Sequence, residues 1–296
     1  MLREDLTARS LELRAARVPF VHARVTLAEA PTSAKPGDEA IVLADGSIEG
    51  FVGGACAETT VRESSLGVLA TGEPVVLRIT PEPEPTQPGK AVVHNPCLSG
   101  GTLEVFLEPV VPPPLVVVVG GAPIARALAS VGAGLAWAVE RYDGSVPPDA
   151  AALVVASHGR GEEEALVAAL ETGVPYVGLV ASRRRGTAVV ESLDLPPELR
   201  ARVHTPAGLD LGARTPGEVA LSILAEIVQS RGDRPIVAPA AGRAAPPAGR
   251  SIDPVCGMTV FHEEGGLVVE HAGREVWFCG RGCRDAFVAD PAAYAS

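Results

Sequence analysis

Residues 115–120 read LVVVVG, a nearly continuous aliphatic run that is typical of a parallel strand buried on both faces of a sheet. Helical and strand-like stretches then alternate along the chain, at 123–132, 135–142, 152–159, 161–172, 176–181 and 215–231. Strand–helix alternation at this spacing predicts an α/β domain with a doubly wound parallel sheet over residues 115–232. No other pattern in the sequence constrains the fold as strongly.

Residues 1–111 follow a different pattern. A short amphipathic helix carrying four leucines comes first, and two strand-like runs follow at 19–30 and 39–46. The stretch GFVGGACAE then leads into a second helical pattern that closes on Gly72, and a further strand-like run lies at 101–109. This order of elements predicts an α+β domain.

The remaining residues divide into a linker and a small module. The stretch APAAGRAAPPAG at 238–249 has no apolar periodicity and predicts a linker over residues 233–250. Residues 251–296 form a cysteine-bearing module after it. Because so short a segment buries little apolar surface, a module of this size is typical of one that a bound metal ion stabilises.

The composition excludes several classes of function. The formal net charge is −11 and the pI is near 5.1, whereas nucleic-acid binding needs a concentrated positive surface, so no such partner is expected. No apolar run approaches the ~20 residues of a membrane span, and the charged N-terminal residues lack the apolar core of a signal peptide. We therefore expect a cytoplasmic protein with no membrane partner. The five cysteines then indicate metal-binding or reactive thiols rather than disulfides.

The GFVGGACAE stretch places Cys56 directly after a pair of glycines and one alanine. Gly53 and Gly54 carry no side chains, so a bulky partner can approach the backbone there. If a helix begins just after the cysteine, the thiol lies at its positive end, where Glu58 can accept from backbone amides. Cys97 precedes a glycine pair in a similar setting. These residues predict thiols that face a ligand, with small core cysteines as the alternative.

The first buried strand of the second domain ends at Gly120-Gly121-Ala122. A dinucleotide-binding loop would carry a glycine at the middle position, where Ala122 places a methyl group, so NAD(P) binding is disfavoured. The helix that follows can still hold an anion at its N-terminus. Further polar residues come after neighbouring strands of the same edge: His158, Ser182 and Arg183. The histidine either orients a ligand or bonds to nearby backbone.

The C-terminal module carries three cysteines, Cys256, Cys279 and Cys283. Three thiolates with a fourth ligand make a tetrahedral site for Zn²⁺ or a softer site for Cu(I), and His262 and His271 are the candidate fourth ligands. The alternative is a small core in which the cysteines pack against neighbouring aromatic side chains.

Several stretches resemble a known family. DGSIEGFVGGACAE and CLSGGTLEVFLEP are similar to the N-terminal domain of the xanthine dehydrogenase accessory (XdhC/CoxI) family. GLVASRRR and PAGLDLGARTPGEVALSILAEI resemble its Rossmann-like second domain, and DPVCGM with FCGRGCRDAFVADPAAY resembles a YHS domain. The chain departs from the family's usual loops at Ala55, Gly159 and Ala181, where glycine, aspartate and glycine are usual.

The resemblance implies a protein that binds the molybdenum cofactor (molybdopterin), supports its sulfuration and delivers it to an apo molybdenum hydroxylase, such as xanthine or carbon monoxide dehydrogenase. A cysteine desulfurase-type sulfur donor would be a second partner, and homodimerisation is left open. The predicted cofactor-binding residues are Gly53, Gly54, Cys56, Glu58, Cys97, Gly120, Gly121, His158, Ser182 and Arg183. The protein is expected to be a delivery factor rather than an enzyme. The alternatives are an NAD(P)-dependent oxidoreductase and a metal-trafficking protein centred on the YHS-like module.

Overall fold

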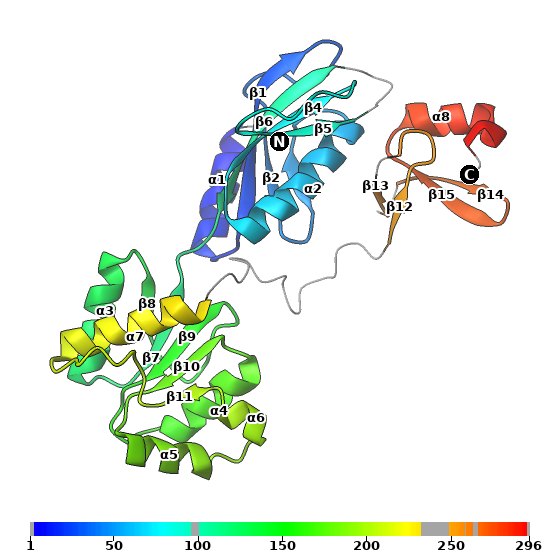
Figure 1. Cartoon of the computed structure of the whole chain (residues 1–296). Helices are drawn as coiled ribbons and strands as arrows, with labels where there is room; N and C mark the ends of the chain where they lie inside the picture. The colour runs from blue at the N-terminus through cyan, green and yellow to red at the C-terminus, as the bar shows by residue number, and fades with distance from the viewer. Residues whose placement is uncertain (1–2, 96–100, 232–248, 258, 263–265, 295–296) are drawn as a thin grey trace. The chain divides into compact units, whose positions relative to one another are not determined.

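The structure is a computed structural model that describes residues 3–95, 101–231, 249–257, 259–262 and 266–294. Contacts within the chain group its elements, which are drawn in Figure 1, into two compact units. Unit 1 combines residues 1–112 with residues 235–296, and unit 2 comprises residues 113–234. Cys97 and most of the predicted linker lie outside the described residues.

Unit 2 contains the predicted doubly wound parallel sheet. Its elements are β7 (Leu115–Val119), α3 (Pro123–Gly134), β8 (Ala138–Arg141), β9 (Ala150–Val155), α4 (Glu162–Thr172), β10 (Tyr176–Leu179), α5 (Arg183–Ser192), α6 (Pro197–Arg200), β11 (Val203–His204) and α7 (Pro216–Arg231). The strands pair in the order β11-β10-β9-β7-β8, and every pair is parallel. The chain leaves β7 for β8 on one side and returns to β9 on the other, so the carboxyl ends of β7 and β9 form the topological switch point.

Successive side chains of β7 explain why this strand is aliphatic throughout. Val116 and Val118 pack against Leu128 of α3 and Ile223 of α7, on one face of the sheet. Leu115, Val117 and Val119 belong to the core that includes α4, on the other face. Because both faces are covered by helices, a polar side chain anywhere along β7 would be buried, as the predicted pattern requires.

Residues 1–112 of unit 1 form a six-stranded sheet with one helix on each face. The elements are α1 (Arg3–Ala15), β1 (Phe20–Glu29), β2 (Glu39–Leu43), β3 (Ile48–Gly50), α2 (Ala55–Thr71), β4 (Val75–Thr80), β5 (Lys90–His94) and β6 (Thr102–Val110). The strand order is β3-β2-β1-β6-β4-β5, antiparallel except for the parallel β4–β5 pair. The sequence pattern had not revealed β3, β4 or β5.

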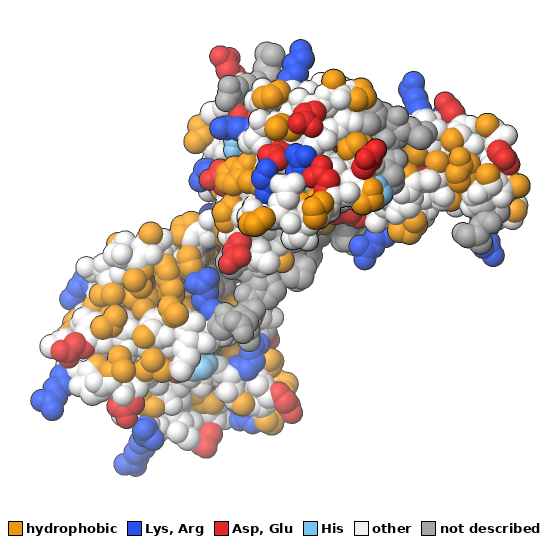
Figure 2. All heavy atoms as spheres, turned by 45° about the horizontal axis from the view of Figure 1, so that its top comes forward, with side chains coloured by type: hydrophobic (Ala, Val, Ile, Leu, Met, Phe, Trp, Pro, Cys, Tyr) orange, Lys and Arg blue, Asp and Glu red, His pale blue; other side chains and the backbone are white. Residues whose placement is uncertain are grey.

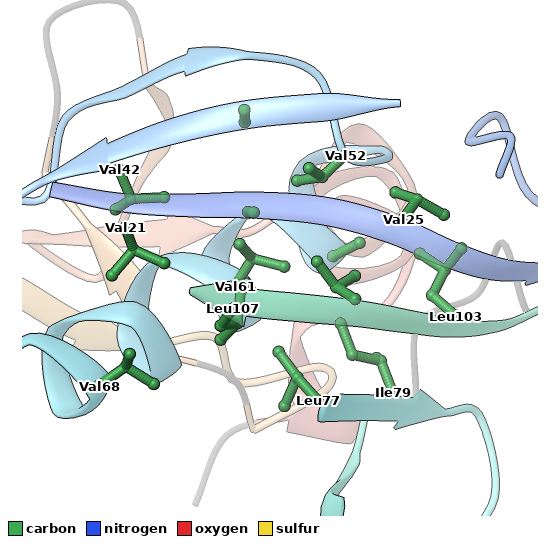
Figure 3. Packing of buried hydrophobic residues seen from close by; sticks show 14 of the residues in the cluster. Val21, Val25, Val42, Val52, Val61, Val68, Leu77, Ile79, Leu103 and Leu107 are labelled. Atoms are coloured by element: carbon green, nitrogen blue, oxygen red, sulfur yellow. The ribbon is translucent and has the colours of Figure 1, made fainter. Parts of the chain in front are cut away.

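The main core of this sheet lies under α2. Val61 and Val68 of the helix pack against Val21, Leu77 and Leu107 of the strands (Figure 3). The opposite face is covered in part by α1, whose Leu6 and Leu13 join a smaller core. The core under α2 fixes the axis of this helix, and with it the position of the helix N-terminus.

Gly67 lies within α2 at an exposed position, and a methyl group added there would meet no atom within 4 Å. Gly67→Ala is expected to raise the free energy of unfolding by about 0.5–1 kcal/mol, because glycine loses more backbone entropy than alanine in a helix. Chemical denaturation followed by circular dichroism measures this change. An unchanged or lower stability would contradict the exposed helical environment described for Gly67.

The C-terminal module, residues 249–294, contains two short hairpins and a helix. Its elements are β12 (Arg250–Ile252), β13 (Thr259–Phe261), β14 (Leu267–His271), β15 (Arg274–Phe278), α8 (Arg281–Ala289) and a final 3₁₀ turn (Pro291–Tyr294). Phe278, Phe287, Cys279 and Cys283 form its buried core, and Cys56 of α2 belongs to the same cluster. The module therefore completes its small core with a residue from the N-terminal part of unit 1.

The surface agrees with the acidic composition. Basic side chains are interspersed with acidic ones on the face shown in Figure 2, and no broad basic patch is visible on that face among the described residues. Within the described part of the chain, no helix combines the length and apolarity needed to cross a membrane.

Candidate functional site

A cavity of about 710 Å³ in unit 1 contains the first candidate site. It is lined by the β1–β2 loop at residues 30–33, the start of α2 at residues 54–57, and the start of α8 at residues 280–283. This volume lies within the range of small-molecule binding sites.

Cys56 lies in the first turn of α2 and lines the cavity. The helix begins at Ala55, two residues before the predicted start, so the thiol lies one residue inside the helix. Gly54 is the N-cap, and a side chain added there would meet no atom within 4 Å. Gly53 has a φ of +138°, and its added methyl would lie 3.0 Å from Ala57. Gly53 therefore forms the turn, whereas Gly54 leaves space at the cavity wall.

Asn95 is a second wall residue, and sequence reasoning missed it. Its side-chain amide donates to the Cys56 carbonyl and to Thr60 Oγ1, both at 3.1 Å, which fixes the orientation of the amide. Asn95 is 4% exposed, and its Oδ1 accepts no hydrogen bond from the described residues. A buried acceptor without a partner is costly, so this oxygen is suited to an N–H donor on a bound ligand.

Two helix N-termini meet this cavity. Neither Gly54 of α2 nor Gly280 of α8 supplies a side-chain cap, and the first amide groups of a helix have no carbonyl partners within it. The exposed Arg281, at the start of α8, adds a positive charge to the same lining. Amide dipoles and a guanidinium together favour an anionic group.

Four sulfur atoms lie close together beside this lining. The Sγ atom of Cys279 is 3.4 Å from that of Cys256, 3.6 Å from that of Cys56 and 3.7 Å from that of Cys283. The structure thus brings together the three cysteines predicted to bind a metal, and it adds Cys56, which is 223 residues from Cys279 in the chain.

Asp253 holds the cysteine loops in place. It is completely buried, and its two carboxylate oxygens accept hydrogen bonds from the backbone N–H groups of Val255 and Cys279, both at 2.9 Å. A carboxylate oxygen of Asp253 and the sulfurs of Cys256, Cys279 and Cys283 all lie within 4.8 Å of one another. The group therefore has the composition and compactness of a site for a single metal ion.

The thiols of Cys279 and Cys283 are hard to ionise. Hydrogen bonds with the sulfurs of Cys256 and Cys56, together with burial, raise the pKa of the Cys279 thiol far above its usual range. Burial raises the pKa of Cys283 as well, and the nearby Asp253 adds to that effect. Burial and these contacts therefore favour the neutral thiols of Cys279 and Cys283.

The two histidines proposed as fourth ligands lie elsewhere. His262 stacks on Trp277 with ring centroids 4.2 Å apart, and its Nε2 is 2.6 Å from Ser251 Oγ. His271 packs edge-on against Phe287. Among the described residues, the group compact enough for an ion contains Asp253 and no histidine.

Unit 2 contains the second candidate site, at the carboxyl ends of β7 and β9. Gly120 has a φ of +104°, and a methyl group added to it would lie 2.5 Å from the Ala156 carbonyl oxygen. The same addition at Gly121 would meet only the Arg141 guanidinium, at 3.7 Å. Gly120 is thus required by the packing of the chain on itself, and Gly121 is the position with room for a ligand.

The loop that carries His158 is held by Glu162, a residue that the sequence pattern did not single out. Glu162 accepts hydrogen bonds from Ser157 Oγ at 3.1 Å and from the Gly159 N–H at 2.6 Å, and it forms an ion pair with Arg185. These bonds flank His158, which has a φ of +55°. The buried Glu162 carboxylate, at the first position of α4, therefore holds this loop in place.

The predicted Ser182 and Arg183 lie at the start of α5, on the same edge. Ser182 is the N-cap of the helix, and its hydroxyl accepts from the Arg185 N–H at 3.4 Å. Arg183 is the first residue of the helix and is exposed. Ser182 thus has a structural role, and Arg183 remains accessible.

His204 and the loop after β11 are tied to Glu226 of α7. This carboxylate accepts from the Tyr176 hydroxyl and the Gly208 N–H, both at 2.6 Å, and pairs with His204 Nδ1 at 3.0 Å. Burial acts to raise the pKa of Glu226, but these hydrogen bonds outweigh it and lower the pKa. His204 thus anchors the loop after β11 to α7.

The predicted cofactor residues are divided between the two units. Gly53, Gly54 and Cys56 surround the cavity of unit 1, and Glu58 pairs with Arg62 at 3.0 Å. No hydrogen bond is found from a backbone amide to Glu58 among the described residues, in contrast to the capping role expected for it. The remaining predicted residues belong to unit 2, apart from Cys97.

Comparison with known proteins matches both large domains to one family. Residues 13–80 match the model of the XdhC and CoxI family, and residues 116–227 match the model of the XdhC Rossmann domain. These matches support the XdhC/CoxI family. They confirm the resemblance for the two domains that carry the candidate sites, and the C-terminal module lies outside both matched segments.

Two curated relatives share this similarity. The chain is 28% identical over 261 residues to the uncharacterized protein YqeB of Escherichia coli K12, covering 78% of this chain and 47% of that protein. It is 34% identical over 86 residues to a probable xanthine dehydrogenase subunit of Bacillus subtilis, covering 29% of this chain and 24% of that protein. The chain therefore spans less than half the length of either relative.

One solved structure is also similar. A protein from Bacillus halodurans, described as a xanthine dehydrogenase, aligns with 17% sequence identity and a TM-score of 0.36. The alignment covers 75% of this chain and 94% of that one.

Proposed function

We propose that this protein binds the molybdenum cofactor as cargo, in the cavity of unit 1, and delivers it to an apo molybdenum hydroxylase. The observation that carries the proposal is the convergence of a thiol, two helix N-termini and a buried acceptor on one cavity of about 710 Å³. The XdhC/CoxI matches support an accessory or maturation role. The name of the Bacillus subtilis relative favours a client of the xanthine dehydrogenase type.

The chemistry of the lining fits the chemistry of the cargo. The cofactor carries a phosphate, which the amide groups of α2 and α8 and the Arg281 guanidinium would hold. Its pterin ring carries N–H donors, and Asn95 Oδ1 is a buried acceptor that takes no bond from the described residues. Cys56 supplies the soft ligand that a molybdenum–sulfur group favours.

The residues would act as a holding site rather than as catalysts. Gly54 keeps the wall open, and the α2 N-terminus favours the thiolate of Cys56 when a ligand approaches. Delivery requires only that this contact be weaker than the contacts in the client. A cysteine desulfurase-type sulfur donor is the second partner in this proposal.

The test is to purify the full chain from cells that make the cofactor and to measure bound molybdenum and extracted pterin. The wild type is expected to retain both. Cys56→Ala removes the thiol and Gly54→Leu fills the cavity, so each is expected to lower retention by roughly tenfold or more, about 1.4 kcal/mol of binding. Gly67→Ala, a change in the same helix away from the cavity, is the matched control and is expected to retain both.

Two outcomes would contradict the proposal. One is a wild-type protein that carries neither molybdenum nor pterin, and the other is full retention by both cavity variants. Pterin without molybdenum would show that the protein takes the metal-free precursor instead of the finished cofactor.

A further inference from the structure

We propose that the C-terminal module is a detachable lid on the cavity of unit 1, held to α2 by the packing of the Phe261 ring against the Arg62 guanidinium. The inference deepens the proposed function, because it names how the same site opens and closes. It rests on that function for the identity of the cargo that the lid retains. The movement of the lid does not depend on the cargo, so the two can be tested separately.

One wall of the cavity belongs to the module. Residues 280–283, at the start of α8, line the cavity together with the β1–β2 loop and the start of α2. Gly280 lies close to α2, since a methyl group added to it would be 3.9 Å from Cys56 Sγ. Arg281 adds its positive charge from the same wall. Departure of the module would therefore open one side of the cavity and remove a charge that attracts an anionic cargo.

The module can leave this position without breaking a sheet. In the part of the chain that the structure describes, its strands pair only with one another, β12 with β13 and β14 with β15. Phe278 and Phe287, whose ring centroids are 5.2 Å apart, both belong to the module and stay packed on each other when it moves. All of unit 2 lies between β6 and β12 in the sequence, so no short connection ties the module to α2.

Side chains of α2 hold the module in place. Cys56 Sγ lies 3.6 Å from Cys279 Sγ, and the Arg62 guanidinium lies 5.3 Å from the centre of the Phe261 ring in β13. A guanidinium within about 6 Å of a ring centre is attracted by the negative face of the ring. The Arg62 side chain is only 8% exposed, so water competes little for this contact. The contact between Arg62 and Phe261 is therefore the latch of the lid.

The α2 side of the latch exists before the module docks. Glu58, one turn earlier in the helix, accepts a hydrogen bond from Arg62 Nη2 at 3.0 Å. This ion pair lies within one helix, so it holds the guanidinium in position whether the module is present or not. Glu58 is thus a positioning residue for the lid. A preformed seat lets the module dock again after each opening, which a cycle of loading and delivery requires.

The first test measures the movement without any cargo. The full chain is purified from cells that cannot make the molybdenum cofactor, and it is kept reduced. Cys56 is 9% exposed, so its rate of alkylation by iodoacetamide, followed by mass spectrometry, reports the fraction of molecules in which the module is undocked. Phe261→Ala is expected to raise this rate by roughly tenfold, because the contact with Arg62 is lost.

Three further variants make the result specific. Phe261→Tyr keeps an aromatic ring and is expected to restore the slow rate. Val288→Ala shortens an exposed side chain of α8 and is expected to match the wild type. Arg62→Met removes the other half of the latch and is expected to act like Phe261→Ala, with no further increase when the two are combined. Hydrogen exchange in the β14–β15 hairpin is expected to stay unchanged, which separates undocking from unfolding of the module.

The second test measures release of the cargo. Wild type and Phe261→Ala are purified from cells that make the cofactor, and the loss of bound pterin during dialysis is followed over time. Phe261→Ala is expected to lose pterin roughly tenfold faster, in proportion to its larger undocked fraction. Val288→Ala is again expected to behave like the wild type.

Three results would overturn the inference. The first is equal alkylation of Cys56 in the wild type, Phe261→Ala and Arg62→Met. The second is a rise in alkylation that comes with equally faster hydrogen exchange in the β14–β15 hairpin, since the module would then unfold rather than undock. The third is faster alkylation with an unchanged rate of pterin loss. A wild type without molybdenum and pterin would contradict the proposed function alone, and the alkylation rates would still decide whether the module undocks.

Discussion

Gly120→Ala is expected to lower the free energy of unfolding of unit 2 by about 2–5 kcal/mol. Two costs add together at this position. The φ of +104° is a conformation that alanine rarely adopts, and the new methyl group would lie 2.5 Å from the Ala156 carbonyl oxygen and 2.7 Å from Ser157 Cα. Both contacts are with backbone of the neighbouring β9 loop, so relief would require the sheet edge to open.

Hydrogen exchange measured by mass spectrometry resolves this effect by unit. Peptides from β7 and β9 are expected to exchange faster in Gly120→Ala, while peptides from β1 and β6 of unit 1 serve as an internal reference. Gly121→Ala is the matched control, since its methyl group would meet only a side chain, at 3.7 Å. Equal effects of the two variants would show that Gly120 is not the tightly packed position described.

Asp253→Ala is expected to destabilise the C-terminal module by about 2–5 kcal/mol, because it leaves two backbone N–H groups without an acceptor. The carboxylate is completely buried and accepts from Val255 and Cys279, which lie on the two loops that supply the cysteines. Faster hydrogen exchange is expected in peptides from β13 and β15.

Asp285→Ala provides the control for this variant. Asp285 is exposed and pairs with the adjacent Arg284 at 2.7 Å, so its removal is expected to change stability by no more than about 0.5 kcal/mol. A module that tolerates Asp253→Ala as well as Asp285→Ala would contradict the assignment of Asp253 as the residue that joins the two loops.

The strand–helix alternation of unit 2 was readable from the sequence because both faces of its sheet are covered. Each central strand therefore carries an uninterrupted aliphatic run, such as that of β7. The strands β4 and β5 were missed for the opposite reason. Their side chains are largely half-buried, and the proline-rich segment between them resembles a long loop.

The sequence identifies some residues of the candidate site in unit 1 but not others. Glycines and thiols mark local chemistry, so Gly54, Cys56 and the cysteines of the module could be identified. Asn95 and Asp253 form hydrogen bonds with the backbone of Cys56 and Cys279, which are distant from them in the sequence and come close only in the folded chain. No short sequence motif therefore identifies either residue. Likewise, the contact between Cys56 and Cys279 joins residues 223 positions apart. The histidines were misassigned because their ring stacking could not be anticipated.

Unit 1 is discontinuous in the chain, and this has a consequence for synthesis on the ribosome. Residues 1–112 emerge first, unit 2 follows, and the residues that supply Cys279 and Cys283 emerge after both. Domains generally fold as they emerge, so α2 and its thiol are complete while the sulfurs that will surround Cys56 have not yet been translated. During that interval the Cys56 thiol lacks its contact with Cys279 Sγ, and the cavity beside it lacks the wall that the start of α8 supplies.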